Sequence, residues 1–209
     1  QSNSIRYQNQ NSHTSGNNGG FVVTDIVKKP IIYIYPIEKM DVEVKLGNPQ
    51  YLSCTYPKYK NGWSVTADVD GTLVDKNTEK NLYALYWEGK EVPKNINLKE
   101  GFCVKGKDTA TFLEEKLSLL GLSDKEAEEF IIYWLPKMEE NNYNYIRFET
   151  KEEQDKSMPL EITPKPDNLI RVMMDWKGLD EKIEVQEQNL ETPIREGYTV
   201  VEWGGTEIK

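Results

Sequence analysis

The folded part of the chain opens with Ile31-Ile32-Tyr33-Ile34-Tyr35-Pro36, a run of β-branched and aromatic residues closed by a proline. Such residues fit the pleated, half-buried surface of a sheet, so the run predicts a strand. Similar short runs recur downstream, separated by turn dipeptides such as Asn61-Gly62 and Asp70-Gly71. The expected strands are 42–46, 51–56, 63–67 and 82–87. Together they predict an antiparallel meander or small sandwich over about 30–100.

After residue 100 the apolar residues change from a spacing of two to helical spacing. Asp108 or Thr109 can cap a first helix. The apolar residues on one face of that helix are Phe112, Leu113, Leu117 and Leu120. Ser123 and Glu126 match the capping-box pattern and therefore predict a second helix over 124–130.

The segment 130–135 is ambiguous, because its spacing fits a helix while its residues are β-formers. We expect a strand there, paired with 143–148. Further strands are expected at 169–174, 182–185 and 198–203. The predicted class is α+β, mostly antiparallel β followed by a helical pair packed on an antiparallel sheet. We expect a β-rich subdomain over 29–100 and an α+β subdomain over 101–209.

The beginning of the chain, 1–28, is expected to form a flexible polar arm. Sixteen of its first 20 residues are Gln, Ser, Asn, Gly or Thr. Such a segment buries too little apolar surface to offset the conformational entropy that it would lose on ordering. Residues 21–27 could instead form a strand, paired within the chain or with a neighbouring subunit, which would allow self-association. A polar spacer ahead of a folded domain is typical of cell-surface proteins, so we expect an extracytoplasmic location.

The composition excludes several classes of function. With 26 Lys and Arg against 35 Asp and Glu, the net charge is −9, which would repel nucleic acid. No run of about 18 apolar residues is present, so we expect no transmembrane segment. The single histidine, His13, lies in the polar arm, which argues against a histidine-dependent nucleophile or a zinc site. We expect no cofactor and no metal.

The two cysteines, Cys54 and Cys103, lack the spacing of a metal or redox motif. Outside the cytoplasm they could form one disulfide. Alternatively, they are two buried free thiols that behave as small apolar residues. The sequence leaves both possibilities open.

The segment 68–75, Asp-Val-Asp-Gly-Thr-Leu-Val-Asp, resembles the first motif of haloacid-dehalogenase-like phosphohydrolases. That resemblance implies Asp68 as the nucleophile, Asp70 as the general acid, and Mg²⁺ between the phosphate and the carboxylates. The family requires a buried parallel strand before the motif, whereas 63–67 alternates like a half-exposed strand. We therefore favour a polar hairpin turn around Asp70-Gly71.

A row of tyrosines and tryptophans between residues 33 and 87 suggests a binding surface. Tyr56, Tyr59 and Trp63 are the best candidates, since Pro, Lys and Gly between them would hold aromatic rings outward in a loop. Exposed rings of this kind could stack on a glycan or anchor a protein partner. The alternative is that these aromatics form the core of a small sandwich.

Four stretches together resemble an uncharacterised bacterial protein family of Firmicute-like composition. They are 29–36 (Lys-Pro-Ile-Ile-Tyr-Ile-Tyr-Pro), 56–63, 130–136 and 200–205 (Val-Val-Glu-Trp-Gly-Gly). The resemblance spans about 29–205. It implies that this range forms one unit, and it implies no activity or site residue.

These features favour a non-catalytic extracytoplasmic binding or surface-structural protein on a flexible tether. One alternative is a carboxylate-dependent hydrolase of glycans or phosphate esters, which requires two acids in a cleft about 5 to 9.5 Å apart or a carboxylate-bound metal. Another is a self-assembling subunit that uses residues 21–27 to complete a neighbour's sheet. The binding function instead requires an exposed aromatic platform.

Overall fold

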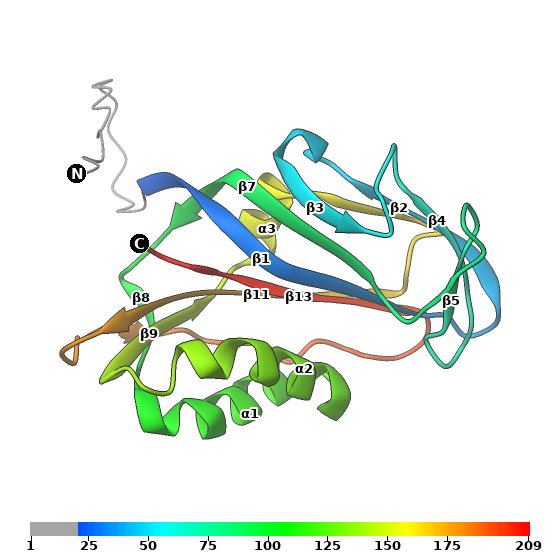
Figure 1. Cartoon of the computed structure of the whole chain (residues 1–209). Coiled ribbons are helices and arrows are strands. Elements are labelled where there is room, and N and C mark those ends of the chain that lie inside the picture. Colours follow the sequence, from blue (N-terminus) through cyan, green and yellow to red (C-terminus); the bar gives the residue numbers. More distant parts are fainter. Residues whose placement is uncertain (1–20) are drawn as a thin grey trace.

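The computed structural model describes residues 21–209 and shows an α+β fold, which confirms the predicted class (Figure 1). An eight-stranded sheet forms the centre. Two longer helices cover one face of this sheet, and a five-stranded sheet and a short helix cover the other. The core therefore has two layers, one on each side of the large sheet.

The large sheet contains β1 (Phe21–Tyr35), β3 (Leu52–Tyr56), β7 (Leu85–Ile96), β8 (Glu100–Lys105), β9 (Tyr143–Phe148), β11 (Asn168–Leu179), β12 (Gln186–Glu187) and β13 (Thr199–Glu207). Its strand order is β12-β8-β9-β11-β13-β1-β7-β3. Neighbouring strands are antiparallel except for the parallel pairs β11–β13 and β12–β8. Because β1 lies in the middle, segments from the two ends of the chain are hydrogen-bonded side by side.

The small sheet contains β2 (Met40–Leu46), β4 (Trp63–Ala67), β5 (Leu73–Asp75), β6 (Asn81–Leu82) and β10 (Leu160–Thr163). Its order is β10-β2-β4-β5-β6, and all its pairs are antiparallel. Every second residue is buried in β2 and β4, with exposed residues between them in β2 and half-buried ones in β4, as the alternating sequence pattern predicts. Their buried residues pack against Ile32, Ile34 and Trp87 of the large sheet.

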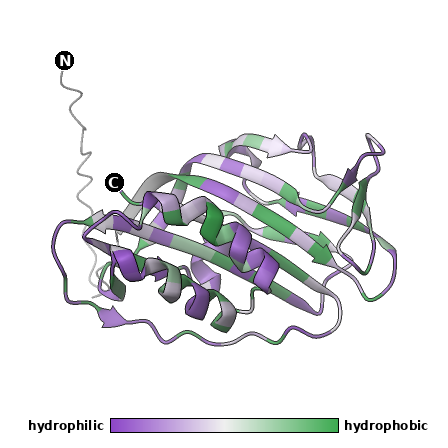
Figure 2. Cartoon of the chain, turned by 60° about the horizontal axis from the view of Figure 1, so that its bottom comes forward, coloured by the Kyte–Doolittle hydropathy of each residue, from purple (hydrophilic) through white to green (hydrophobic). Residues whose placement is uncertain are grey.

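The helices are α1 (Thr109–Leu119), α2 (Asp124–Trp134) and α3 (Lys151–Ser157), with 3₁₀ turns η1 (Pro49–Tyr51), η2 (Gly106–Asp108) and η3 (Leu135–Lys137). The predicted capping box at Ser123 and Glu126 is present at the start of α2. A second capping box, between Thr150 and Glu153, starts α3. In Figure 2, α1 and α2 lie across the large sheet and carry both hydrophilic and hydrophobic residues, as expected of helices with one buried face.

Aromatic side chains join α2 to the large sheet. Phe130 lies 5.3 Å from Trp203 of β13, and Trp134 lies 6.3 Å from Trp176 of β11, measured between ring centroids. A Cβ atom on Gly205 would lie only 2.8 Å from the Trp134 ring. Glycine at this position therefore lets the tryptophan rest directly on the backbone of the sheet.

The expectation of a strand at 130–135 is wrong, because these residues form the end of α2 and the start of η3. The capping box starts the helix, and Phe130 and Trp134 are then buried one turn apart on the sheet. Tertiary packing thus overrides the β-propensity of the residues. The strand expected to pair with this segment, β9, pairs instead with β8 and β11.

Strands from 29–100 and from 101–209 share the large sheet, so the expected boundary near residue 100 does not separate two sheets. The expected strand at 82–87 is divided between β6 and β7, because the chain crosses there from the small sheet to the large one. No strand forms at 182–185, where Ile183 is exposed and only the following β12 pairs with β8.

Residues 21–27 belong to β1 and pair with β7 of the same chain, with Phe21 opposite Ile96. This is the within-chain alternative expected for the segment. The first part of the expected arm, 1–20, lies outside the described residues. Within 21–209, no helix has the length and apolar character needed to cross a membrane.

Candidate functional site

The segment with the phosphohydrolase-like sequence forms the turn between β4 and β5. The Asp68 amide donates to the Thr72 carbonyl at 2.9 Å, and Gly71 has a φ of +88°. The two strands are antiparallel, so the predicted hairpin turn is present. The Asp70 carboxylate accepts a hydrogen bond from the Thr72 amide at 2.9 Å, which lowers the pKa of Asp70. The Asp68 carboxylate accepts one from the Val69 amide at 2.8 Å, so both acids stabilise their own turn.

The three predicted binding aromatics lie in different environments. Trp63 is 2% exposed and donates its indole N–H to the Pro57 carbonyl at 2.8 Å. Tyr59 is half-buried, with its ring 5.0 Å from that of Trp63 and its hydroxyl accepting from the Leu46 amide. Tyr56 is 55% exposed. The structure therefore brings Tyr59 and Trp63 together in the core, as the alternative interpretation expected, and leaves Tyr56 on the surface.

Tyr56 lies at one end of a larger group of tyrosines. It is directly opposite Tyr86 of β7, which places both side chains on the face of the large sheet that carries α2. We use the name tyrosine surface for this group, which comprises Tyr33, Tyr35, Tyr56, Tyr83, Tyr86 and Tyr133. Tyr56 and Tyr83 are more than half exposed, Tyr86 and Tyr133 are half-buried, and Tyr33 is buried. The rings thus form a patch that runs from the edge of the sheet towards α2.

The inner tyrosines are fixed by carboxylates of α2. The Tyr33 hydroxyl donates to Glu129 at 2.6 Å and accepts from the Trp203 indole N–H at 2.9 Å. The Tyr35 hydroxyl donates to Glu126 at 2.6 Å. Burial and the hydrogen bonds to the Glu129 and Glu126 carboxylates raise the pKa values of Tyr33 and Tyr35 far above the ordinary value of 10, so both hydroxyls remain protonated donors.

Glu126 is a fully buried acid at the base of the tyrosine surface. Arg195 donates to its two oxygens at 2.6 and 2.9 Å, and the Ser123 amide donates at 2.9 Å. Burial alone would raise the pKa of Glu126, but the hydrogen bonds from Arg195, Tyr35 and Ser123 outweigh it and lower the pKa. Glu126 therefore stays ionised and ties α2 to β1 and to the segment that contains Arg195.

Lysine side chains lie over the outer rings. The Lys29 ammonium is 5.6 Å from the centroid of Tyr86 and 5.4 Å from that of Tyr133. Lys125 lies 4.8 Å from Tyr83. Lys29 has a φ of +63° in an irregular part of β1, between the pairings of Val27 and Ile31 with β7. These cation–π contacts restrict the positions of the three outer rings.

The row of aromatics predicted between residues 33 and 87 contains five of the six members of the tyrosine surface, but only Tyr56 of these was among the three best candidates, and Tyr133 lies outside the row. Glu126, Glu129 and Tyr133 occur at helical spacing and would have indicated one face of α2. The expectation of a strand at 130–135 concealed this pattern. Contacts between α2 and β1 join residues more than 90 positions apart, and no local pattern predicts them.

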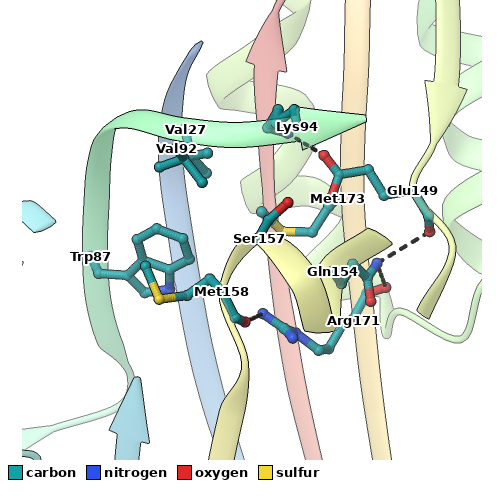
Figure 3. A pocket seen from close by; sticks show the side chains of 10 residues that line it. All are labelled: Val27, Trp87, Val92, Lys94, Glu149, Gln154, Ser157, Met158, Arg171 and Met173. Atoms are coloured by element: carbon teal, nitrogen blue, oxygen red, sulfur yellow. Dashed lines mark hydrogen bonds and ion pairs between the residues drawn. The ribbon is translucent and has the colours of Figure 1, made fainter. Parts of the chain in front are cut away.

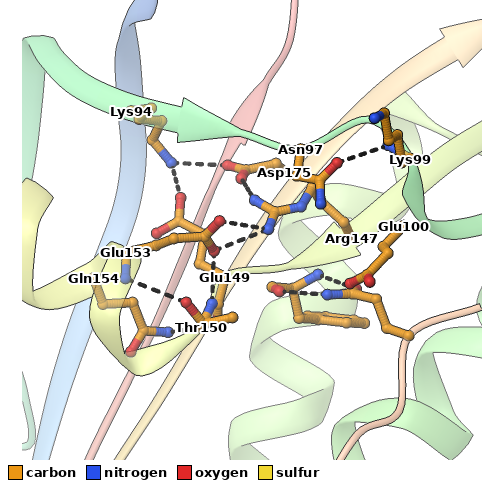
Figure 4. Close-up of polar contacts among 12 residues, drawn as sticks. Lys94, Asn97, Lys99, Glu100, Arg147, Glu149, Thr150, Glu153, Gln154 and Asp175 are labelled. Carbon is orange, nitrogen blue, oxygen red and sulfur yellow. Dashed lines mark hydrogen bonds and ion pairs between the residues drawn. The ribbon is translucent and has the colours of Figure 1, made fainter. Parts of the chain in front are cut away.

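Carboxyl groups also converge beneath α3, as Figure 4 shows, next to a small cavity that is lined by Lys94 and Glu149 (Figure 3). The α3 cluster, as we name it, consists of Lys94, Arg147, Glu149, Glu153 and Asp175. Lys94 bridges Glu149 and Asp175, with its ammonium 2.8 Å from Asp175. Arg147 contacts Asp175 at 3.0 Å and both oxygens of Glu153 at 2.8 and 2.9 Å.

The α3 cluster is closed to a substrate. The side chains of Glu149 and Asp175 are 4% and 1% exposed. The adjoining cavity has a volume of about 10 Å³, room for one water molecule. A hydrolase would need an open cleft between its two acids. Within 21–209, no group of three or more His, Cys, Asp or Glu residues is placed to hold a metal ion.

Both cysteines are free. Cys54 lies on β3, at one edge of the large sheet, and Cys103 lies on β8, near the opposite edge. The width of the sheet therefore separates the two thiols. Cys54 is exposed rather than buried, and Cys103 is half-buried, with its sulfur accepting a hydrogen bond from the Ile183 amide.

Comparison with known proteins adds no further constraint on function. The chain matches no family model, and neither a curated protein nor a solved structure is significantly similar to it. The tyrosine surface is therefore the feature on which a function can be argued, since it is the part of the described chain that combines exposed aromatic rings with polar groups held in place.

Proposed function

We propose that the protein is a non-catalytic binding protein whose tyrosine surface binds a neutral glycan. The observation that carries this proposal is the arrangement of Tyr56, Tyr86 and Tyr133. Tyr56 and Tyr86 are directly opposite each other on the neighbouring strands β3 and β7. The Lys29 ammonium makes cation–π contacts with both Tyr86 and Tyr133. Neighbouring rings at fixed positions suit a ligand made of repeated, ring-shaped units.

The chemistry of the tyrosine surface favours a sugar. The C–H groups on one face of a pyranose ring can stack on a tyrosine ring, while its hydroxyls need both donors and acceptors at the rim. Tyrosine hydroxyls and the Lys29 and Lys125 ammonium groups donate, and the Glu88 carboxylate beside Tyr86 accepts. Tyrosine is enriched in protein–protein interfaces, but lysine and glutamate are depleted from their cores, and the charged groups among these rings therefore favour a sugar over a protein partner.

The charge of the chain favours a neutral glycan over an anionic one. Two of the rings with a lysine above them also have a carboxylate nearby, Glu88 at Tyr86 and Glu129 at Tyr83. The whole chain carries a net charge of −9. An anionic polymer would gain little from the few lysines and would be repelled by the remainder of the protein. An extracytoplasmic location is part of the proposal, and it is supported by the polar composition of residues 1–20.

The test is calorimetric titration of the full chain with a panel of neutral oligosaccharides built on glucose, xylose, mannose and N-acetylglucosamine. At least one should bind, and Tyr86→Ala should weaken its binding about tenfold or more, equivalent to about 1.4 kcal/mol. Tyr143→Ala is the matched control, because Tyr143 is a half-buried tyrosine of β9 outside the tyrosine surface. Equal binding by wild type and Tyr86→Ala, or no binding by any oligosaccharide at millimolar concentration, contradicts the proposal.

A further inference from the structure

The α3 cluster contains more acidic groups than basic ones. Two cationic groups, Lys94 and Arg147, face three carboxyl groups. If all five were ionised, the buried cluster would carry one uncompensated negative charge. A buried unpaired charge is costly, and a carboxyl group in that position normally takes up a proton instead.

Groups around the α3 cluster do not supply the missing positive charge. Arg171 is already paired with Glu202 at 3.2 Å and lies 3.7 Å from Asp155. Tyr145, which also faces the cluster, is a neutral phenol. The ionisable groups that lie nearest Glu149 on the surrounding elements are Lys94 of β7, Tyr145 and Arg147 of β9, Arg171 and Asp175 of β11, Glu202 of β13, and Glu153 and Asp155 of α3.

We infer that the α3 cluster is a buried proton-binding site, in which Glu149 holds one proton at neutral pH and thereby keeps α3 seated on the large sheet. The geometry identifies the protonated acid. Asp175 receives hydrogen bonds from both Lys94 and Arg147, and Glu153 receives two from Arg147 and is 17% exposed. Glu149 is more deeply buried than Glu153, and of the two cations it contacts only Lys94.

The pKa of Glu149 agrees with this assignment. Burial, followed by the nearby Asp175 carboxylate, raises the pKa of Glu149 to about 8, against an ordinary value of 4.5. The folded protein therefore binds more protons than the unfolded chain between pH 4.5 and 8. Its stability falls as the pH rises through this interval and levels off above it.

Glu149 is placed where the loss of its proton would affect α3 directly. It immediately precedes the capping residue Thr150, and its carbonyl accepts a hydrogen bond from Gln154. Gln154 also donates to the Arg171 carbonyl at 2.8 Å, and Ser157 donates to the Pro93 carbonyl at 2.8 Å. The small cavity has room for only one water molecule, which is too little to hydrate a new charge, so α3 must lift to admit more water.

The test is hydrogen exchange of the α3 amides, 151–157, between pH 5 and 9, corrected for the intrinsic dependence of exchange on pH. If opening of α3 releases the proton, the opening equilibrium of wild type should rise by up to about tenfold per pH unit between pH 5 and 8. Glu149→Gln, which mimics the protonated acid, should remove this dependence. Glu152→Gln should keep it, because Glu152 is an exposed residue on the same helix.

A second measurement does not require the variant to fold. The infrared spectrum of wild type at pH 6 should contain the C=O band of a protonated carboxyl group, and this band should disappear by pH 9.5. The absence of this band at pH 6 would overturn the inference. The inference would also be overturned if hydrogen exchange of α3 depended on pH to the same extent in wild type and in folded Glu149→Gln. The inference is supported if the band is present at pH 6 and lost by pH 9.5, and if α3 exchange in Glu149→Gln does not depend on pH.

Discussion

Replacing Glu126 by glutamine should destabilise the protein far more than the same change at Glu128. Glu126 is fully buried and accepts hydrogen bonds from Arg195, Tyr35 and the Ser123 amide. Glutamine keeps the shape but loses the charge, and its amide N–H₂ group would face two donors. Glu128 lies on the exposed side of the same helix, so Glu128→Gln reproduces the chemical change without the burial.

The magnitude follows from the contacts. Removing one partner of a buried ion pair costs about 3 to 5 kcal/mol, and the partial exposure of Arg195 reduces this to about 2 to 3 kcal/mol. For a chain of this length, the melting temperature should fall by roughly 4 to 12 °C. Glu128→Gln should change the free energy of unfolding by less than about 0.5 kcal/mol.

The assay is urea unfolding of wild type and both variants, followed by tryptophan fluorescence at several pH values. The pKa of Glu126 is lowered by folding, so its contribution is present above the ordinary value of 4.5 and is lost as the pH falls through the lowered value. The difference between wild type and Glu126→Gln should therefore shrink in acid. Equal stability of the two variants at pH 7 would refute the idea that Glu126 organises the base of the tyrosine surface.

Two further predictions concern the backbone and the thiols. Gly71→Ala should lower the free energy of unfolding by more than about 1 kcal/mol, because Gly71 has a φ of +88° and the added Cβ would lie 2.8 Å from the Tyr35 ring. An unchanged melting temperature in thermal unfolding would contradict this. Without reducing agent, the protein should show two free thiols by mass spectrometry after alkylation, and Cys54 should react faster than Cys103 because it is exposed. A disulfide, or faster reaction of Cys103, would contradict the structure.

Local patterns in the sequence predicted much of the fold. The Ser123–Glu126 capping box located the start of α2, and the Asp70-Gly71 dipeptide located the turn between β4 and β5. Both features depend on hydrogen bonds between residues a few positions apart. The segment 130–135 was misassigned because its structure is determined by packing on Trp203 and Trp176, which are distant in the sequence.

The candidate site was less predictable, because it is assembled from distant segments. The loop-like surroundings of 56–63 predicted that Tyr56 and Trp63 would both be on the surface, whereas Trp63 belongs to β4 and is buried in the core between the two sheets. The charges of the α3 cluster resemble the many solvated acids and lysines of the chain. Lys94, Glu149 and Asp175 become a cluster only when the fold brings β7, β11 and the segment after β9 together.

The most direct test of the tyrosine surface is nuclear magnetic resonance with labelled tyrosine and lysine side chains, during titration with the tightest-binding oligosaccharide of the panel. The account predicts that the largest shifts fall on Tyr56, Tyr86 and Tyr133 and on the Lys29 ammonium group. It also predicts that the signals of Tyr143 and Tyr145 do not shift. These two residues lie on β9, which β11 and β13 separate from β1 in the large sheet. Shifts that are confined to residues outside the tyrosine surface would contradict the proposed function.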